Sequence, residues 1–242
     1  MKTKLDPSAD LSAQIAGAIR DAIIDGTLPV DERLPSEIEL CEQFDVSRST
    51  VREALKRVAV HALICTQRCA TGGAFVKGLN YADAYAQQIT TSTLLLSMNE
   101  VDFATACEAR FTLERACAPL SAKRRTPDHL ATMRAEIHRQ GQSGLSDEAF
   151  CASDVAFHRA LVDAAHNPVL SYQLAGAVEA MQPLMNMITF TARDRDKIIR
   201  LHTDLANAIE QENAVEADRV LQTLASETNA MADTVFTARA GR

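Results

Sequence analysis

The chain has 242 residues, of which 47% are hydrophobic and 24% are charged, and its formal net charge is −7. This length suits one large domain or two modest ones, each able to bury a core. No apolar run approaches the roughly 18 residues of a membrane-spanning helix, and the N-terminus lacks the apolar segment of a secretion signal. The six cysteines form no CxxC pair, which favours reduced thiols in a cytoplasmic protein.

The first third of the chain predicts a helix-turn-helix. A leading helix is expected over residues 11–25, where apolar side chains recur at helical spacing before Gly26. In residues 34–57, Ser36 can cap a second helix and Ser47 a third. The exposed start of this third helix carries Arg48, Ser49, Thr50 and Arg52. Because the N-terminal end of a recognition helix meets bases and phosphates in the major groove, these four residues predict DNA binding.

A β-hairpin is predicted directly after the helix-turn-helix. Short β-prone runs at residues 63–66 and 74–76 flank a segment that contains two glycines. This pattern is typical of the wing of a winged-helix domain, and it places Arg68 where it can contact the DNA backbone or the minor groove. A linker follows, so we expect a DNA-binding domain over residues 1–78 and a second domain over residues 79–242.

The acidic total does not argue against DNA binding, because the charge is unevenly distributed. Residues 46–78 contain six basic side chains and one acidic side chain, a local charge of +5. The segment before residue 46 and the segment after residue 78 each carry −6. Counterion release depends on the local charge of the binding surface, so the basic segment is the relevant one.

The second domain is predicted to be all helical, which makes the whole chain mainly α. Its helices are expected at residues 81–97, 100–124, 127–140, 147–165, 168–190, 192–212 and 214–238. No strand pattern appears in this part of the sequence. Several helices joined by short breaks predict an antiparallel bundle that can enclose a cavity.

Four sequence motifs in two domains resemble one family. They are LPSEIELCEQFDVSRSTVREALKRV with the glycine-containing wing, then EARFTLERACAPLSA (108–122), DVAFHRALVDAAHNPVL (154–170) and LHTDLANAIEQENAVEA (201–217). Their order resembles the GntR superfamily, in its FadR-like branch with an all-helical FCD ligand domain. The resemblance implies a homodimeric bacterial transcription regulator, usually a repressor, that a small carboxylate metabolite releases from its operator DNA or retains on it.

The resemblance also assigns DNA contacts residue by residue. Arg48, Ser49, Thr50 and Arg52 fall on the family's DNA-contacting positions, and Gly72 and Gly73 fall on the wing tip. Many family members have a DNA-contacting arginine where this chain has Ile38. We therefore expect a reduced or altered set of contacts.

A metal site is predicted in the helical domain. Asp154 and His158 lie four residues apart and share one helix face, and His202 lies on a later helix. Such a set suits zinc, nickel or manganese. Family members that bind metal use a further histidine, which would fall at Leu224, so the ligand set is incomplete. Two alternatives remain: direct binding of an acyl or aromatic ligand without metal, or a purely structural set in which Asp154 pairs with His158 and His202 is a satisfied core residue.

Arg110 is the predicted partner of the effector's carboxylate. Glu108 and Arg110 match the family's E-x-R, and the guanidinium fork binds carboxylates with two hydrogen bonds. A surface ion pair between Arg110 and Glu114 is the alternative. Three ligands with an open position would also suit a metal-dependent enzyme, but no general base is identifiable, so no catalytic activity is expected.

Overall fold

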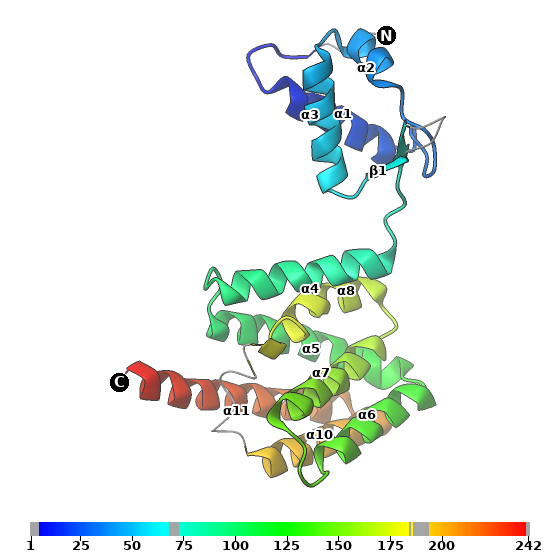
Figure 1. The fold of residues 1–242 in the computed structure, drawn as a ribbon. Coiled ribbons are helices and arrows are strands. Elements are labelled where there is room, and N and C mark those ends of the chain that lie inside the picture. The colour runs from blue at the N-terminus through cyan, green and yellow to red at the C-terminus, as the bar shows by residue number, and fades with distance from the viewer. Residues whose placement is uncertain (1–4, 68–72, 184, 186–193, 241–242) are drawn as a thin grey trace. The chain divides into compact units, whose positions relative to one another are not determined.

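The computed structural model describes residues 5–67, 73–183, 185 and 194–240, with only the backbone described for residues 66–67 and 235–240. Two compact units make up the chain, Met1–Ala84 and Tyr85–Arg242. Helices dominate both units, as the sequence predicts (Figure 1). Among the described residues, no helix is both long enough and apolar enough to cross a bilayer.

The N-terminal unit contains the predicted helix-turn-helix and hairpin. Its elements are α1 (Leu11–Ile24), α2 (Glu37–Phe44), α3 (Arg48–Val60), β1 (Ile64–Gln67) and β2 (Gly73–Val76). Ser36 and Glu39 form a reciprocal capping box at the start of α2, and Ser47 caps α3. Asp45 takes a left-handed conformation (φ 55°) that ends α2 and makes the turn. The two strands pair antiparallel, with Ile64 opposite Val76.

The core of this unit lies between α1, α3 and the hairpin. α1 packs against α3, and α2 also packs against α3. Ile15 of α1 and Val51 of α3 are fully buried, and Val76 of β2 is 1% exposed. This packing turns the N-terminal end of α3, with its polar and basic side chains, toward solvent.

The helical unit is built from long helices joined by short turns. They are α4 (Tyr81–Ser97), α5 (Phe103–Arg124), α6 (Pro127–Gln140), α7 (Asp147–Asp163), α8 (Pro168–Val178), α10 (Arg195–Glu210) and α11 (Ala214–Ala240). α6 packs against α7, α5 against α11, and α10 against both α6 and α11. The main core cluster includes Phe111, Met133, Phe157, Leu205 and Leu221. Five helices therefore surround the region where the predicted ligand residues lie.

One predicted helix is wrong in its length. The sequence pattern predicts a helix over residues 168–190, but α8 ends at Val178 and residues 179–181 form a turn. Residues 182, 183 and 185 are helical again, so a turn interrupts the predicted helix. Pro183 has no N–H to donate to the carbonyl of Glu179, so one i to i+4 hydrogen bond across this turn is missing. Most of the remaining predicted segment lies outside the described residues.

Candidate functional site

The start of α3 presents the predicted DNA-contacting residues. Arg48 and Ser49 are exposed, and Thr50 is half-buried. The Ser47 hydroxyl accepts the Thr50 backbone N–H at 3.2 Å and lies 2.7 Å from the Ser49 hydroxyl. In the described part of the chain, no carboxylate lies within ion-pair distance of Arg48. The positive end of the helix dipole, exposed hydroxyls and a cation thus coincide, as an approaching phosphate requires.

Arg52 is also exposed, but it has a protein partner. Its Nε lies 2.9 Å from Oε2 of Glu37 on α2. An exposed pair of this kind is worth about 0–1 kcal/mol, so DNA phosphates can displace it at little cost. Ile38, which stands at the family's arginine position, is 54% exposed on α2.

The wing is only partly described. Gly73 begins β2, and a Cβ there would lie 2.8 Å from Nε of Arg33. A side chain at position 73 would therefore displace the Arg33 guanidinium. Arg68 and Gly72, the other two predicted contacts, lie outside the described residues.

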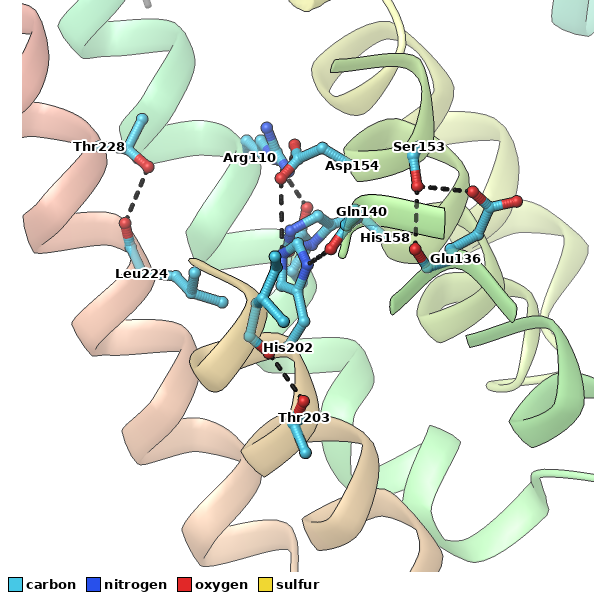
Figure 2. Close-up of polar contacts among 12 residues, drawn as sticks. Arg110, Glu136, Gln140, Ser153, Asp154, His158, His202, Thr203, Leu224 and Thr228 are labelled. Atoms are coloured by element: carbon cyan, nitrogen blue, oxygen red, sulfur yellow. Dashed lines mark hydrogen bonds and ion pairs between the residues drawn. The ribbon is translucent and has the colours of Figure 1, made fainter. Parts of the chain in front are cut away.

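The three predicted metal ligands converge in the helical unit. Asp154 and His158 lie one turn apart on α7, and His202 comes from α10; Figure 2 shows the three side chains meeting beside Arg110. All three are buried, and their ligand atoms lie within 4.8 Å of one another. Around a tetrahedral ion with bond lengths of about 2.1 Å, ligand atoms are about 3.4 Å apart, so binding requires the most distant of these atoms to approach one another by at most about 1.4 Å.

His158 is held by a buried carboxylate that sequence reasoning treated as a surface residue. Its Nδ1 lies 2.7 Å from Oε2 of Glu114, which is fully buried on α5. Burial alone would raise the pKa of Glu114, but His158 and Arg110 outweigh it and hold this pKa below its ordinary value. An ionised Glu114 can only accept, so His158 donates Nδ1–H and directs Nε2 away from it. Nδ1 of His158 therefore has its partner in Glu114. It does not need the predicted alternative partner, Asp154.

His202 is not the satisfied core histidine of the alternative interpretation. It is fully buried, it stacks on Phe157 with ring centroids 4.1 Å apart, and its Nδ1 lies 2.8 Å from Oε1 of Gln140. Burial lowers the pKa of His202 to about 3, so the ring is neutral. Within the described residues its Nε2 has no hydrogen bond, although it lies 3.5 Å from Oδ1 of Asp154. An orphaned imidazole nitrogen facing a carboxylate is a donor set that fits a divalent metal.

Arg110 lies at the same place but not on the surface. It is 2% exposed, and its Nε donates to Oε1 of Glu114 at 2.9 Å. Its Nη2 lies 3.6 Å from Oδ2 of Asp154. Burial alone would lower the pKa of Arg110, but the two carboxylates outweigh it and raise this pKa. The predicted pair with Glu114 therefore exists, and it lies in the interior rather than on the surface.

A cavity of about 250 Å³ opens against this cluster. Arg110, Asp154 and His158 form part of its wall, and Leu224 projects from α11 toward the same place (Figure 2). Glu108 does not reach this cavity: it is exposed and lines a separate hollow with Thr112 and Arg115. Sequence reasoning also missed Gln140, for which no local pattern gives a signal.

Comparison with known proteins agrees with this architecture. The model described as "Bacterial regulatory proteins, gntR family" matches residues 11–76, and the model described as "FCD domain" matches residues 105–226. The Galactonate operon transcriptional repressor of Escherichia coli (strain K12) is 27% identical over 204 residues, which cover 84% of this chain and 88% of that protein. The HTH-type transcriptional regulator LutR of Bacillus subtilis (strain 168) is 28% identical over 204 residues, covering 82% and 90%.

A solved structure shows the same fold. The Streptococcus agalactiae GntR chain matches with a TM-score of 0.55 at 21% identity, covering 90% of this chain and 98% of that one. Together with the two family models, which span both compact units, this likeness accounts for the winged helix-turn-helix and for the helical bundle. The chain belongs to the gntR family of bacterial regulatory proteins with an FCD domain, and it is a DNA-binding transcription regulator rather than an enzyme.

Proposed function

We propose that this regulator is a metabolite-responsive repressor whose helical unit binds a small carboxylate effector through a divalent metal. The observation that carries the proposal is the convergence of two imidazoles and a carboxylate, from His158, His202 and Asp154, beside a cavity whose wall includes Asp154, His158 and Arg110. A metal bound there supplies positive charge and open coordination positions for carboxylate oxygens.

The charge of the cavity supports a metal over a carboxylate bound by protein alone. Two cations among the described lining residues, Arg110 and Lys197, face three carboxylates, so the wall has one excess negative charge with histidines counted as neutral. Glu114 behind Arg110 adds another. An anionic effector would be repelled by this wall. A divalent cation changes the charge of the lining residues from −1 to +1 and neutralises the total of −2 that includes Glu114.

On the DNA side, the exposed start of α3 supports operator recognition by Arg48 and Arg52. Each good bidentate base contact is worth about 1–3 kcal/mol of discrimination against a wrong base.

A homodimer places two such helices on the half-sites of a near-palindromic operator. Exposed apolar side chains at the C-terminal end of α4 are available to a second copy, namely Leu94 and Leu95 on the helix and Met98 directly after it. Effector binding changes the affinity for DNA only to the extent that the effector prefers one conformation of the protein over the other.

Metal content and ligand response together test the sensing proposal. Protein purified without a histidine tag is analysed for zinc, nickel and manganese, and its thermal unfolding is then followed with sugar acids, dicarboxylates, amino acids and aromatic acids, each with and without zinc. Stabilisation by a carboxylate only when zinc is present is the expected result. The matched control is His138→Ala, an exposed histidine in the last turn of α6, compared with His158→Ala. Equal responses of the two variants would contradict the proposed site.

A metal-free sensor of an acyl or aromatic ligand is the second candidate, and Leu224 favours it. Leu224 is 4% exposed and lines the cavity, as do Leu201 and Met231. An apolar ligand would pack against these side chains, and methionine adapts to irregular shapes. Stabilisation by an apolar ligand that zinc leaves unchanged, in protein that contains no metal, would favour this candidate.

A further inference from the structure

Gln140, the last residue of α6, has an unusual position beside the cluster. It is 2% exposed, and its Oε1 lies 2.8 Å from Nδ1 of His202. Its Nε2 has no hydrogen-bond partner within the described residues, and neither does Nε2 of His202 on the far side of the ring. The amide orientation in this structure thus leaves two buried polar atoms without hydrogen bonds. Unsatisfied polar atoms cost free energy in a packed interior.

The two histidines of the cluster differ in the kind of partner they have. Glu114 is ionised and offers only acceptor atoms to His158, so that ring has one allowed tautomer. A glutamine amide offers an acceptor on one side and a donor on the other. Gln140 can therefore stabilise either neutral tautomer of His202 by turning its amide through about 180°.

The two amide orientations make different use of Asp154. With Oε1 toward the ring, His202 donates Nδ1–H and its Nε2 lone pair faces Asp154. With Nε2 toward the ring, the amide donates to Nδ1 and the ring carries Nε2–H, which faces Oδ1 of Asp154 at 3.5 Å. A closer approach of about 0.5 Å makes that contact a hydrogen bond. The second orientation gives a partner to each of the two atoms that lack one in the first, Nε2 of Gln140 and Nε2 of His202. In exchange, the amide oxygen of Gln140 loses its bond to His202.

We propose that Gln140 is a positioning residue that lets His202 exchange between two tautomers: Nε2–H bonded to Asp154 without metal, and Nδ1–H bonded to Gln140 with metal. The ring carries one proton in both forms. That proton leaves Nε2 and one enters Nδ1, so the exchange releases no net proton. The proposal rests on the proposed metal site, but its first consequence concerns the metal-free protein and is measured there.

The test is the tautomer of His202 in the full-length protein, read from ¹⁵N chemical shifts of labelled histidine at pH 8. Wild-type protein without metal is expected to show Nε2–H at His202, and added zinc is expected to convert it to Nδ1–H. Gln140→Glu offers only acceptors, so His202 should show Nδ1–H even without zinc. His129 is the internal reference, because its Nδ1 accepts the Thr126 backbone N–H at 3.1 Å and its tautomer should not change.

Zinc affinity gives the second measurement. Loss of a partner that orients a metal-binding histidine typically weakens metal binding about 10- to 100-fold, so Gln140→Met should do so. Gln140→Glu should bind zinc at least as tightly as wild type. A wild-type protein that already shows Nδ1–H without metal, or a Gln140→Met variant with wild-type affinity, would overturn the inference.

The outcomes separate this inference from the proposed function. Absence of zinc binding by wild type, together with a tautomer that changes in Gln140→Glu, would refute the metal site and support the positioning by Gln140. Zinc binding with an unchanged tautomer would do the reverse. If Gln140→Glu does not fold, the comparison of wild type with and without zinc still decides the question. Operator binding in a mobility-shift assay reports whether each variant is folded.

Discussion

Removing the charge of Glu114 should destabilise the helical unit more than any exposed ion-pair change. Glu114 accepts from Nε of Arg110 at 2.9 Å and contacts Nδ1 of His158 at 2.7 Å, and it is fully buried. In Glu114→Gln the amide has one acceptor for these two donors, and Arg110 keeps only the carboxylate of Asp154, 3.6 Å away. Breaking a buried pair by removing one partner costs about 3–5 kcal/mol.

The assay is thermal unfolding of the full-length protein without metal, followed by circular dichroism. For a domain of 150–250 residues, about 2–4 °C of melting temperature corresponds to 1 kcal/mol, so Glu114→Gln should lower the transition by about 6–20 °C. The matched control is Arg115→Met, one position along the same helix. Its pair with Asp218 is exposed (Nε to Oδ1 2.6 Å, side chains 41% and 35% exposed) and should contribute within about 1 kcal/mol.

The double variant Arg110→Met with Glu114→Met completes the experiment. It replaces both members of the buried pair with apolar side chains, a change that is often neutral or stabilising. We expect it to be more stable than Glu114→Gln alone. A loss for Glu114→Gln no larger than that for Arg115→Met would refute the reasoning, as would additive losses for Arg110→Met and Glu114→Met, because either result would mean that the buried charges do not depend on one another.

Three further predictions concern other parts of the chain. Arg52→Ala should weaken operator binding about 5- to 150-fold in a mobility-shift titration without lowering the melting temperature, and an unchanged affinity and salt slope would count against α3 as the reading helix. Ser36→Ala removes one side of the capping box and should destabilise the N-terminal unit by about 1 kcal/mol in chemical unfolding, whereas Ser8→Ala should not. Leu224→His should tighten zinc binding in a competition titration, since it adds a fourth ligand at the cavity wall; weaker binding would show that position 224 does not face the ion.

The secondary structure could be predicted where its signals are local. Thr126 and Pro127 mark the start of α6 and Gly141 follows its end, and the predicted and observed bounds of this helix agree. The end of α8 at Val178 was missed, because the apolar pattern continues across the turn at residues 179–181 into residues that are helical again. An interior proline does not by itself decide a helix end, because α5 continues through Pro119.

The residues of the proposed metal site could be named from the sequence, but the residues that contact them could not. Asp154 and His158 share a helix face through their spacing, which sequence alone reveals. Gln140 contacts His202 across 62 residues, and only the packing of α6 against α10 brings them together. Glu114 had a visible partner in Arg110 at i,i+4, but the spacing does not say whether such a pair is buried.

The proposed sensing function explains the buried charges of the helical unit better than stability does. A well-packed apolar cluster of the same volume would stabilise the fold at least as well as Arg110 and Glu114 do, since both ions lose their hydration on burial. The arrangement nevertheless does what an apolar cluster cannot: Glu114 fixes the tautomer of His158 and holds the Arg110 guanidinium at the cavity wall. A variant with both residues replaced by methionine should therefore fold and bind operator DNA, yet lose its response to zinc and carboxylates. Replacing these two residues of α5 would then remove the response to ligands without unfolding the protein. This result is expected if the two charges serve ligand binding and not stability.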